Sequence, residues 1–362
     1  CLNSASSNMT SNYVTPYALS LGATNSQIGL ISAGQNFAST IAQLPAARMP
    51  EFISRKGIWY IVQIFYKLLW IPVILLVLIP MDHIIALTII LVLISAISAL
   101  RGPSWTSMMA DLVPREQRGR YFGKRNLITG MVGLAAMLIS GFIIAYIGFG
   151  TLFILSMIIG LLAIYFFSKM WEPPVKKHFH YKHDFGLDVG RWKLSIKSNK
   201  TLVVFTAYMI IITLGIAIAS PFYAVYMLKT LNIDYVWYAV IITINALVAI
   251  LSQPYWGKIS DKYGDRSIMI ITGIMTVFIP LAWMFASNIP EVIFVQIYDG
   301  FIYGGWTLVV FNFLIGACPQ EKRCSYVANH AFFVGLAAVL GTLAGGFLAE
   351  YFGAGILVLG FT

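Results

Sequence analysis

The sequence contains one long internal repeat. When the 362-residue chain is shifted by 205 positions, residues 16–148 align with residues 221–353. The landmarks that keep their places are prolines, glycines and a loop arginine. They include Pro16 with Pro221, Pro114 with Pro319, Arg118 with Arg323, Gly141 with Gly346 and Gly148 with Gly353. Segments that share the positions of their prolines and glycines are expected to fold alike, so the repeat predicts a molecule of two similar halves.

The composition predicts that both halves lie in a membrane. Hydrophobic residues make up 59% of the chain, charged residues only 10%, and the mean hydropathy is +0.81, far from the averages of soluble proteins. Apolar stretches of roughly 20 residues, enough to cross about 30 Å of hydrocarbon, recur along the chain. They lie at 3–22, 25–48, 57–80, 84–112, 121–147, 149–169, 201–228, 235–256, 267–287, 290–316 and 326–352. We therefore expect an all-α polytopic membrane protein with eleven helices and, at 354–362, the start of a twelfth.

The positions of the basic residues predict the topology. A net charge of +10 would also suit a nucleic-acid-binding protein. Nearly all lysines and arginines, however, fall in alternate loops, after the second, fourth, sixth, eighth and tenth apolar stretches. This is the positive-inside pattern, so we expect these loops, the central linker and the N-terminus to be cytoplasmic. We expect a multi-pass, monomeric protein of the plasma membrane whose partners are the lipid bilayer and a small solute, with no nucleic acid.

Residues 170–200 predict the boundary between the halves. This stretch combines Pro173 and Pro174 with many basic residues, which is typical of a solvated linker. Because position 1 aligns with a position inside a helix of the second half, we expect a fragment of a protein with six plus six helices. The predicted units are an N-terminal bundle at 1–169, the cytoplasmic linker at 170–200, and a C-terminal bundle at 201–362 that is truncated in its twelfth helix.

Three histidines lie close together in this linker. His178, His180 and His183 could bind zinc or nickel. The linker has no cysteines and no second cluster of ligands beside them. We therefore interpret the segment as a solvated basic linker and expect no metal and no cofactor. A metal-dependent membrane protein is the alternative, which a metal analysis of the purified protein would decide.

The loop after the eighth apolar stretch has the residues of a gate. Residues 257–266 read GKISDKYGDR, and the pattern is carried by Gly257, Asp261, Lys262, Gly264 and Arg266. A glycine lets helices approach closely, an aspartate can pair with a basic group or a helix N-terminus, and the two cations hold the loop at the cytoplasmic side. The corresponding loop of the first half, at 49–57, lacks the aspartate, and Glu51 is the nearest substitute.

The loop after the fourth stretch carries a second pattern. Residues 111–123 read DLVPREQRGRYFG, in which Asp111 and Arg118 are charged, and Arg323 repeats the arginine. Together with 257–266, this segment resembles the G-x-x-x-D-[RK]-x-G-[RK]-[RK] and D-x-x-P-x-x-x-R-G-x-x-x-G elements of the major facilitator superfamily (MFS), and the repeat extends the resemblance over essentially the whole chain. The resemblance implies two pseudo-symmetric six-helix bundles around a cavity lined by helices one, four, seven and ten, and a secondary transporter that works by alternating access.

Two charged residues lie deep within predicted membrane helices, where burial is costly. By the helical rise of about 1.5 Å per residue, Arg101 lies about 15 Å from the cytoplasmic end of its helix and Asp299 about 13 Å from the outer end of its own. The resemblance places both on cavity helices of opposite halves. There an acid can take up and release a proton, and an arginine can hold an anionic group. A structural Arg101–Asp299 pair is the alternative. Lys67, on a helix that the resemblance makes peripheral, is expected to snorkel or to have a structural partner, with substrate contact as the alternative.

Several amides and hydroxyls are candidates for the lining of the pathway. Asn8, Asn12 and Thr15 share one face of the first helix, which predicts either interhelical hydrogen bonds or a water-filled cavity. Gln35 aligns with Asn245 when the repeat register is 210. Such amides either line a pathway or join helices.

The sequence as a whole predicts a secondary active transporter with proton coupling through Asp299. Arg101 makes an organic anion the expected substrate, and Tyr303 and Trp306 could add an aromatic wall to its site, although packing is the commoner role of such residues. The alternatives are a multidrug or metabolite efflux protein of the same family and a transporter-like receptor or assembly factor. The chain has no Walker loop, nucleophile elbow or H-E-x-x-H motif, so we expect no enzyme.

Overall fold

The structure, a computed structural model, describes residues 1–46, 49, 54–78, 84–112, 118–171, 200–317 and 323–352, and this part of the chain is helical without strands. Its helices are α1 (Leu2–Ser11), α2 (Val14–Ser20), α3 (Asn25–Ala46), α4 (Arg55–Leu68), α5 (Trp70–Leu78), α6 (Ile84–Leu112), α7 (Arg118–Tyr146), α8 (Phe149–Ser168), α10 (Lys200–Val225), the π-helix η3 (Tyr226–Thr230), α11 (Tyr235–Tyr263), α12 (Asp265–Met284), α13 (Ile289–Ala317) and α14 (Arg323–Phe352). The linker histidines and the expected start of a twelfth helix lie outside the described residues.

The predicted membrane helices are confirmed in the described part of the chain. Three of them consist of two consecutive elements, α1 with α2, α4 with α5, and α10 with η3, and the others are single helices. Within the described residues, nine helical stretches are long and apolar enough to cross a membrane. The first two predicted helices are not among the nine, because the asparagine, serine and glutamine side chains of α1 and α3 lower their hydropathy. These polar side chains therefore need protein or water around them.

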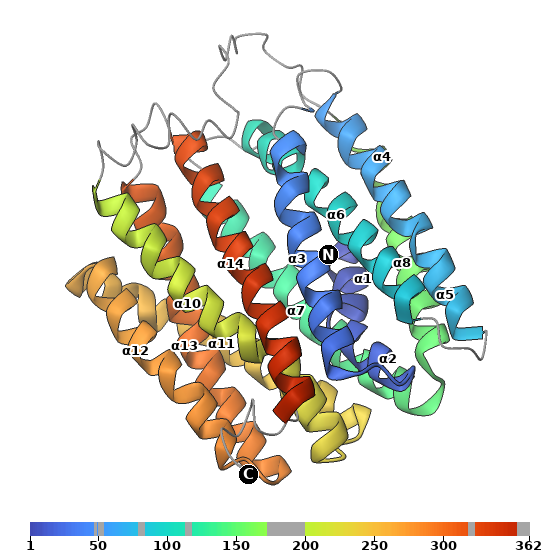
Figure 1. Cartoon of the computed structure of the whole chain (residues 1–362). Helices are drawn as coiled ribbons and strands as arrows, with labels where there is room; N and C mark the ends of the chain where they lie inside the picture. The colour runs from blue at the N-terminus through green and yellow to red at the C-terminus, as the bar shows by residue number, and fades with distance from the viewer. Residues whose placement is uncertain are drawn as a thin grey trace.

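The helices form two bundles, and two helix pairs make most of the contact between them. In the first half α1 packs against α7 and α8, and α6 packs against α3 and α4; in the second half α13 packs against α11 and α12, and α10 against α14. Between the halves, α3 contacts α14 and α7 contacts α11. Figure 1 shows α3 and α14 side by side in the middle of the molecule. The repeat maps α3 onto α11 and α7 onto α14, so the two interfaces are copies of each other.

Small residues allow the close approach at both interfaces. A Cβ added at Gly29 would lie 2.6 Å from Cα of Gly346, and one added at Gly141 would lie 2.2 Å from Cβ of Ala239. Gly141 and Gly346 are partners in the 205-residue repeat, and Gly29 and Ala239 are partners in the 210-residue register. The duplication has therefore placed small residues at matching positions, where dispersion between closely packed helices holds the halves together.

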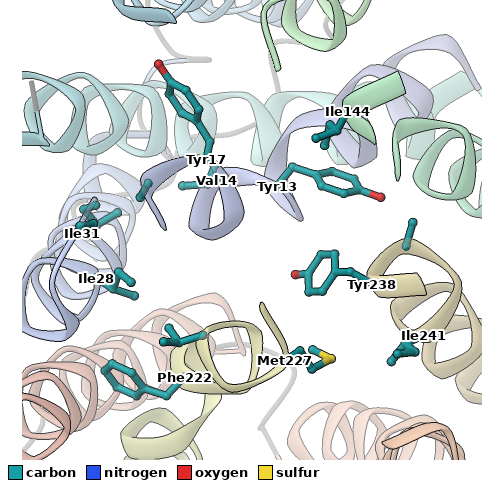
Figure 2. Packing of buried hydrophobic residues seen from close by; sticks show 14 of the residues in the cluster. Tyr13, Val14, Tyr17, Ile28, Ile31, Ile144, Phe222, Met227, Tyr238 and Ile241 are labelled. Atoms are coloured by element: carbon teal, nitrogen blue, oxygen red, sulfur yellow. The ribbon is translucent and has the colours of Figure 1, made fainter. Parts of the chain in front are cut away.

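The halves meet differently at the two ends of the molecule. We call the end where α8 stops and α10 begins the linker end, and the end where α7 stops and α11 begins the far end. At the far end one continuous buried cluster includes Tyr13, Ile28, Phe222 and Tyr238, from both halves (Figure 2). The Tyr13 and Tyr238 rings lie 6.0 Å apart, edge to face.

At the linker end the buried side chains that the structure describes form two separate clusters. The cluster of the first half contains Trp59, Met108, Met109 and Phe167. The cluster of the second half contains Phe205, Met209, Trp256, Ile268, Met269 and Val309. Hydrogen bonds between the halves follow the same division, since Asn25 to Ala349, Lys229 to Ala23 and Tyr238 to Asn12 all lie away from the linker end. The described part of the molecule is thus closed at the far end and divided at the linker end.

Candidate functional site

Asp299 is held by a neutral amide within the second half. The Asn245 side chain on α11 donates Nδ2–H to Oδ2 of Asp299 on α13 at 2.9 Å, and to the carbonyl oxygen of Gln296 at 3.1 Å. The helices approach closely enough for this contact because residue 300 is glycine, where a Cβ would lie 2.4 Å from the Asn245 carbonyl oxygen. A hydrogen bond from an amide satisfies one oxygen of the carboxyl group but adds no opposite charge. The structure therefore brings together two predicted site residues, Asn245 and Asp299.

Arg101 is held by neutral groups within the first half. Its Nη1 donates to Oε1 of Gln63 on α4 at 2.7 Å, and its Cζ lies 4.8 Å from the centroid of the Tyr66 ring. Gln63 is fully buried and its Nε2 donates in turn to Oδ1 of Asn3 at 2.7 Å. Arg101 itself is only half-buried. The guanidinium is thus oriented by an amide and an aromatic face, and its contacts among the described side chains leave further N–H groups for another ligand.

The structure separates Arg101 from Asp299. α6 and α13 are equivalent helices, and Asp299 is equivalent to Ile94, seven positions before Arg101. Seven residues of helix span about 10 Å along the axis. The two charges therefore lie at different depths, and each has its own neutral partner.

Lys67 does not snorkel, contrary to one of its two expected roles. Its side chain is 2% exposed and points into the first half, where Nζ donates to Oγ of Ser6 on α1. Ser6 also shares a hydrogen bond of 2.9 Å with Ser156 on α8. Residue 160 is glycine, and a Cβ there would lie 2.1 Å from Cε of Lys67. The packing of α1, α4 and α8 therefore encloses the amine instead of letting it reach an interface.

The polar face of α1 turns partly toward α7. A Cβ added at Gly133 would lie 2.9 Å from Nδ2 of Asn8, and Ser4 donates its hydroxyl to the carbonyl oxygen of Thr129 at 3.0 Å. Asn8 and Asn12 also donate to main-chain oxygens one turn earlier in α1. Interhelical hydrogen bonding therefore accounts for part of this face, while Asn12 stays half-buried and its role in a pathway stays a prediction.

The remaining predicted lining residues are spread over three helices. Thr15 and Gln35 are half-buried on α2 and α3. Tyr303 is 54% exposed on α13, and its ring centroid lies 6.5 Å from that of the half-buried Trp306. Their place in a substrate pathway stays a prediction.

The gate loop is a one-residue turn. α11 ends at Tyr263, α12 begins at Asp265, and Gly264 between them has a φ of +82°, which favours glycine because it has no Cβ. Asp265 accepts a hydrogen bond from the Ser260 hydroxyl. Its position in the first turn of α12 suits the positive end of the helix dipole.

Three further gate residues are exposed, and the close helix contact predicted at Gly257 is not observed among the described residues. Asp261, Lys262 and Arg266 are exposed, and Nζ of Lys262 lies 5.0 Å from the Tyr263 ring centroid. Among the described atoms, a Cβ at Gly257 would come no closer than 3.7 Å, to Leu308. The close helix approach expected at Gly257 is therefore not found within the described residues. The side chains of Asp111, Arg118 and Arg323 lie outside the described part.

Sequence reasoning missed the partners of the buried cations. Gln63 and Lys67 are spaced i, i+4 on α4, so they share a face, and both are fully buried. An amide one turn from a lysine within an apolar stretch is a signal that the sequence offered. Ser6, Ser156 and Gly160 gave no such signal, because a serine or glycine in a membrane helix is ordinary.

The fold and the site together define a class of protein. Two pseudo-symmetric helical bundles meet along two matching interfaces of small residues, and equivalent helices carry one cation and one carboxyl group near mid-depth. This is the architecture of a multi-pass membrane protein of the secondary-transporter type. The family model described as Major Facilitator Superfamily matches residues 1–216 and again residues 204–362, so the chain belongs to this superfamily.

Individual relatives are more distant. The chain is 30% identical over 112 residues to the multi-drug resistance efflux pump PmrA of Streptococcus pneumoniae serotype 4, covering 31% of this chain and 28% of that protein. It is 26% identical over 264 residues to a PmrA homolog of Lactococcus lactis subsp. lactis, covering 69% and 62% of the two chains. The nucleoside transporter NupG has the same fold, with a TM-score of 0.76, 12% identity and coverage of 99% of this chain and 93% of that one.

Proposed function

We propose that this chain forms a secondary active transporter that moves an organic anion across the cell membrane by alternating access, coupled to protons. The observation that carries the proposal is the state of Arg101. Among the described side chains its contacts are neutral, so a half-buried guanidinium in a membrane helix lacks a compensating anion. An acidic group of a substrate would supply that charge and accept a bidentate hydrogen bond.

The coupling group that we propose is Asp299. It lies on the opposite half from Arg101 and at a different depth, with an amide as its hydrogen-bond partner. A carboxyl group in this setting can be neutral or charged without breaking an ion pair, which suits a group that takes up and releases a proton. Proton uptake at Asp299 and anion binding at Arg101 would then shift the same equilibrium between the two conformations of the halves.

The moving parts that we propose are the units 1–169 and 201–362. They would rock about the interfaces α3–α14 and α7–α11. If the linker end is cytoplasmic, as the basic loops predict, then the present conformation with its divided linker end and closed far end is the inward-facing one. The exposed gate residues Asp261, Lys262 and Arg266 would gain partners when that end closes.

A second candidate is drug efflux, which the names of the relatives favour. The chain spans 28% and 62% of the length of the two pumps that it matches, and efflux of lipophilic cations would make different demands on the site. A cation would be repelled by Arg101 and attracted by Asp299. The two candidates therefore predict opposite charge selectivity.

The test is a ligand screen followed by transport. The full-length protein in detergent is screened by thermal shift against organic acids, neutral analogues and lipophilic cations such as ethidium, and the best ligand is followed into proteoliposomes with an imposed pH gradient. We expect stabilisation by an organic acid and uptake that responds to the gradient. Stabilisation and transport of cations alone would replace this proposal with the efflux candidate.

A further inference from the structure

We propose that Lys67 is a specificity-determining residue, whose protonated amine places a second positive charge next to Arg101 and makes the first half select the acidic group of a transported solute. This inference rests on the proposed function and adds a residue on a helix outside the expected cavity lining. Arg101 would touch the solute. Lys67 would act on it through the electric field, without contact.

The first support is the enclosure of the amine. Lys67 is 2% exposed, its Nζ donates to the Ser6 hydroxyl, and its methylene groups fill the space that a side chain at position 160 would need. The amine is therefore in a fixed place set by three helices, and it cannot swing out to water.

The second support is the sign of the surrounding groups. Among the described side chains, Nζ of Lys67 donates to the Ser6 hydroxyl and lies over the Tyr66 ring, and the like-charged Arg101 lies over the same ring. In the part of the chain whose side chains are described, no carboxylate contacts either cation. A buried and a half-buried cation without an anion raise the free energy of the first half, and one bound anion would relieve both.

The third support is the geometry that links the two cations. Nζ of Lys67 lies 5.1 Å and Cζ of Arg101 lies 4.8 Å from the centroid of the same Tyr66 ring. The charges are therefore at most about 10 Å apart, a distance at which the field is screened much less inside a membrane protein than in water. An acidic group bound to Arg101 would lie within about 14 Å of Lys67, and closer if it binds on the side that faces the amine.

The effect of the Lys67 charge on anion affinity can be estimated from the distance between the charges. With an effective dielectric constant of about 20, a unit charge about 10 Å away changes the affinity for an anion roughly tenfold. A neutral solute of the same shape would be almost unaffected. Lys67 should thus set the ratio between anion and neutral affinities rather than the overall strength of binding.

The experiment uses three probes of similar shape and different charge, namely benzoate, benzamide and benzamidine. Equilibrium binding to the full chain in lipid nanodiscs is measured for the wild type and for Lys67→Met, which keeps the length of the side chain and removes the charge. We expect the wild type to prefer benzoate, and Lys67→Met to bind benzoate about tenfold more weakly with unchanged benzamide affinity. Lys258→Met, at an exposed position of the linker end, removes the same net charge and should change neither.

A second variant separates the field of Lys67 from a general packing defect. Gly160→Ala puts a Cβ where Cε of Lys67 lies, so it should displace the amine and lower the benzoate-to-benzamide ratio. In the Lys67→Met background, where no charge remains to displace, Gly160→Ala should leave the ratio unchanged. Equal effects in both backgrounds would indicate packing alone and would overturn the inference.

The outcomes also distinguish this inference from the proposed function. If Arg101→Gln removes the benzoate preference and Lys67→Met does not, the anion site stands and the role of Lys67 is wrong. If the wild type does not prefer benzoate, or binds none of the three probes at millimolar concentrations, the anion site itself fails and this inference fails with it.

Discussion

α6 and α13 begin and end 205 residues apart, so the repeat makes them the same helix in two halves. They differ in where they carry charge: Arg101 lies where α13 has Trp306, and Asp299 lies where α6 has Ile94. The interfaces show the opposite relation, because Gly141 and its repeat partner take equivalent places at α7–α11 and α3–α14. On the proposed function, the features present twice would serve the movement of the halves, and the charges present once would serve the solute and its coupling.

The largest effect on transport is expected when the cation of the first half is removed. Arg101→Gln keeps a hydrogen-bonding side chain but loses the charge, so we expect uptake of the anion found in the screen to fall about 100-fold or more, since losing a charge-assisted bond at a buried site costs about 3 kcal/mol. Initial uptake rates into proteoliposomes measure it. Arg101→Lys is the matched control and should keep part of the activity, because it restores the charge without the planar fork.

Removing the carboxyl group of the second half should affect coupling and spare binding. We expect Asp299→Asn to abolish accumulation driven by a pH gradient while exchange of internal for external substrate continues. For one proton per solute, a gradient of one pH unit supports about tenfold accumulation, so about tenfold would be lost. The comparison of counterflow with gradient-driven uptake measures it. Gradient-driven accumulation equal to that of the wild type would remove Asp299 from the mechanism.

The two copies of the interface can be compared with one substitution at each. A Cβ at Gly141 would meet Cβ of Ala239 at 2.2 Å and the Tyr235 carbonyl oxygen at 2.6 Å, whereas a Cβ at Gly346 would come no closer than 3.1 Å, to Gly29. We expect Gly141→Ala to lower the free energy of unfolding by about 2–3 kcal/mol and Gly346→Ala by about 1 kcal/mol, because overpacking costs grow with the clash. Thermal unfolding in detergent gives the order, and the reverse order would contradict this account of the interfaces.

The smallest effects are expected at the gate loop. Gly264 has a φ of +82° and a ψ of 148°, so Gly264→Ala should cost about 1–3 kcal/mol of stability, because this backbone conformation is essentially restricted to glycine. Gly257→Ala is the control within the same motif, since a Cβ there meets only Leu308, at 3.7 Å. Because alanine favours a helix interior over glycine by up to about 1 kcal/mol, the control should be neutral or slightly stabilising. Equal losses for the two variants, measured by thermal unfolding, would show that backbone strain does not decide the requirement for glycine at 264.

The arrangement of helices could be predicted well, and the site only in part. The apolar stretches and the repeat register predicted the helices and their equivalence, because both depend on order along the chain. The choice of Arg101 and Asp299 was also possible from sequence, since any charge in an apolar helix stands out. The Asn245–Asp299 contact could not be predicted, because it depends on how closely α11 and α13 pack at Gly300.

Lys67 shows why the orientation of a side chain in a membrane helix could not be predicted from the sequence. The position of its helix in the family suggested the periphery, where a lysine can snorkel, but the side of α4 that carries Lys67 faces α1 and α8. The rotation of a helix about its axis is set by its packing against neighbours. If α4 were rotated about its axis so that Lys67 faced lipid, the side chain would snorkel as expected.

The sequence by itself determined that this protein crosses a membrane many times, that it is built from two copies of one unit, and that it carries the loop motifs of the major facilitator superfamily. These properties follow from hydrophobic length and from the repeat, which are fixed by covalent order. Only the tertiary structure decided that Arg101 and Asp299 have separate neutral partners, that Lys67 is enclosed, and that the halves are joined at the far end. Those facts rest on contacts between residues far apart in the chain, such as Ser6 with Ser156 and Asn25 with Ala349. Such contacts exist only after the helices have packed, because packing fixes the depth and the rotation of each helix.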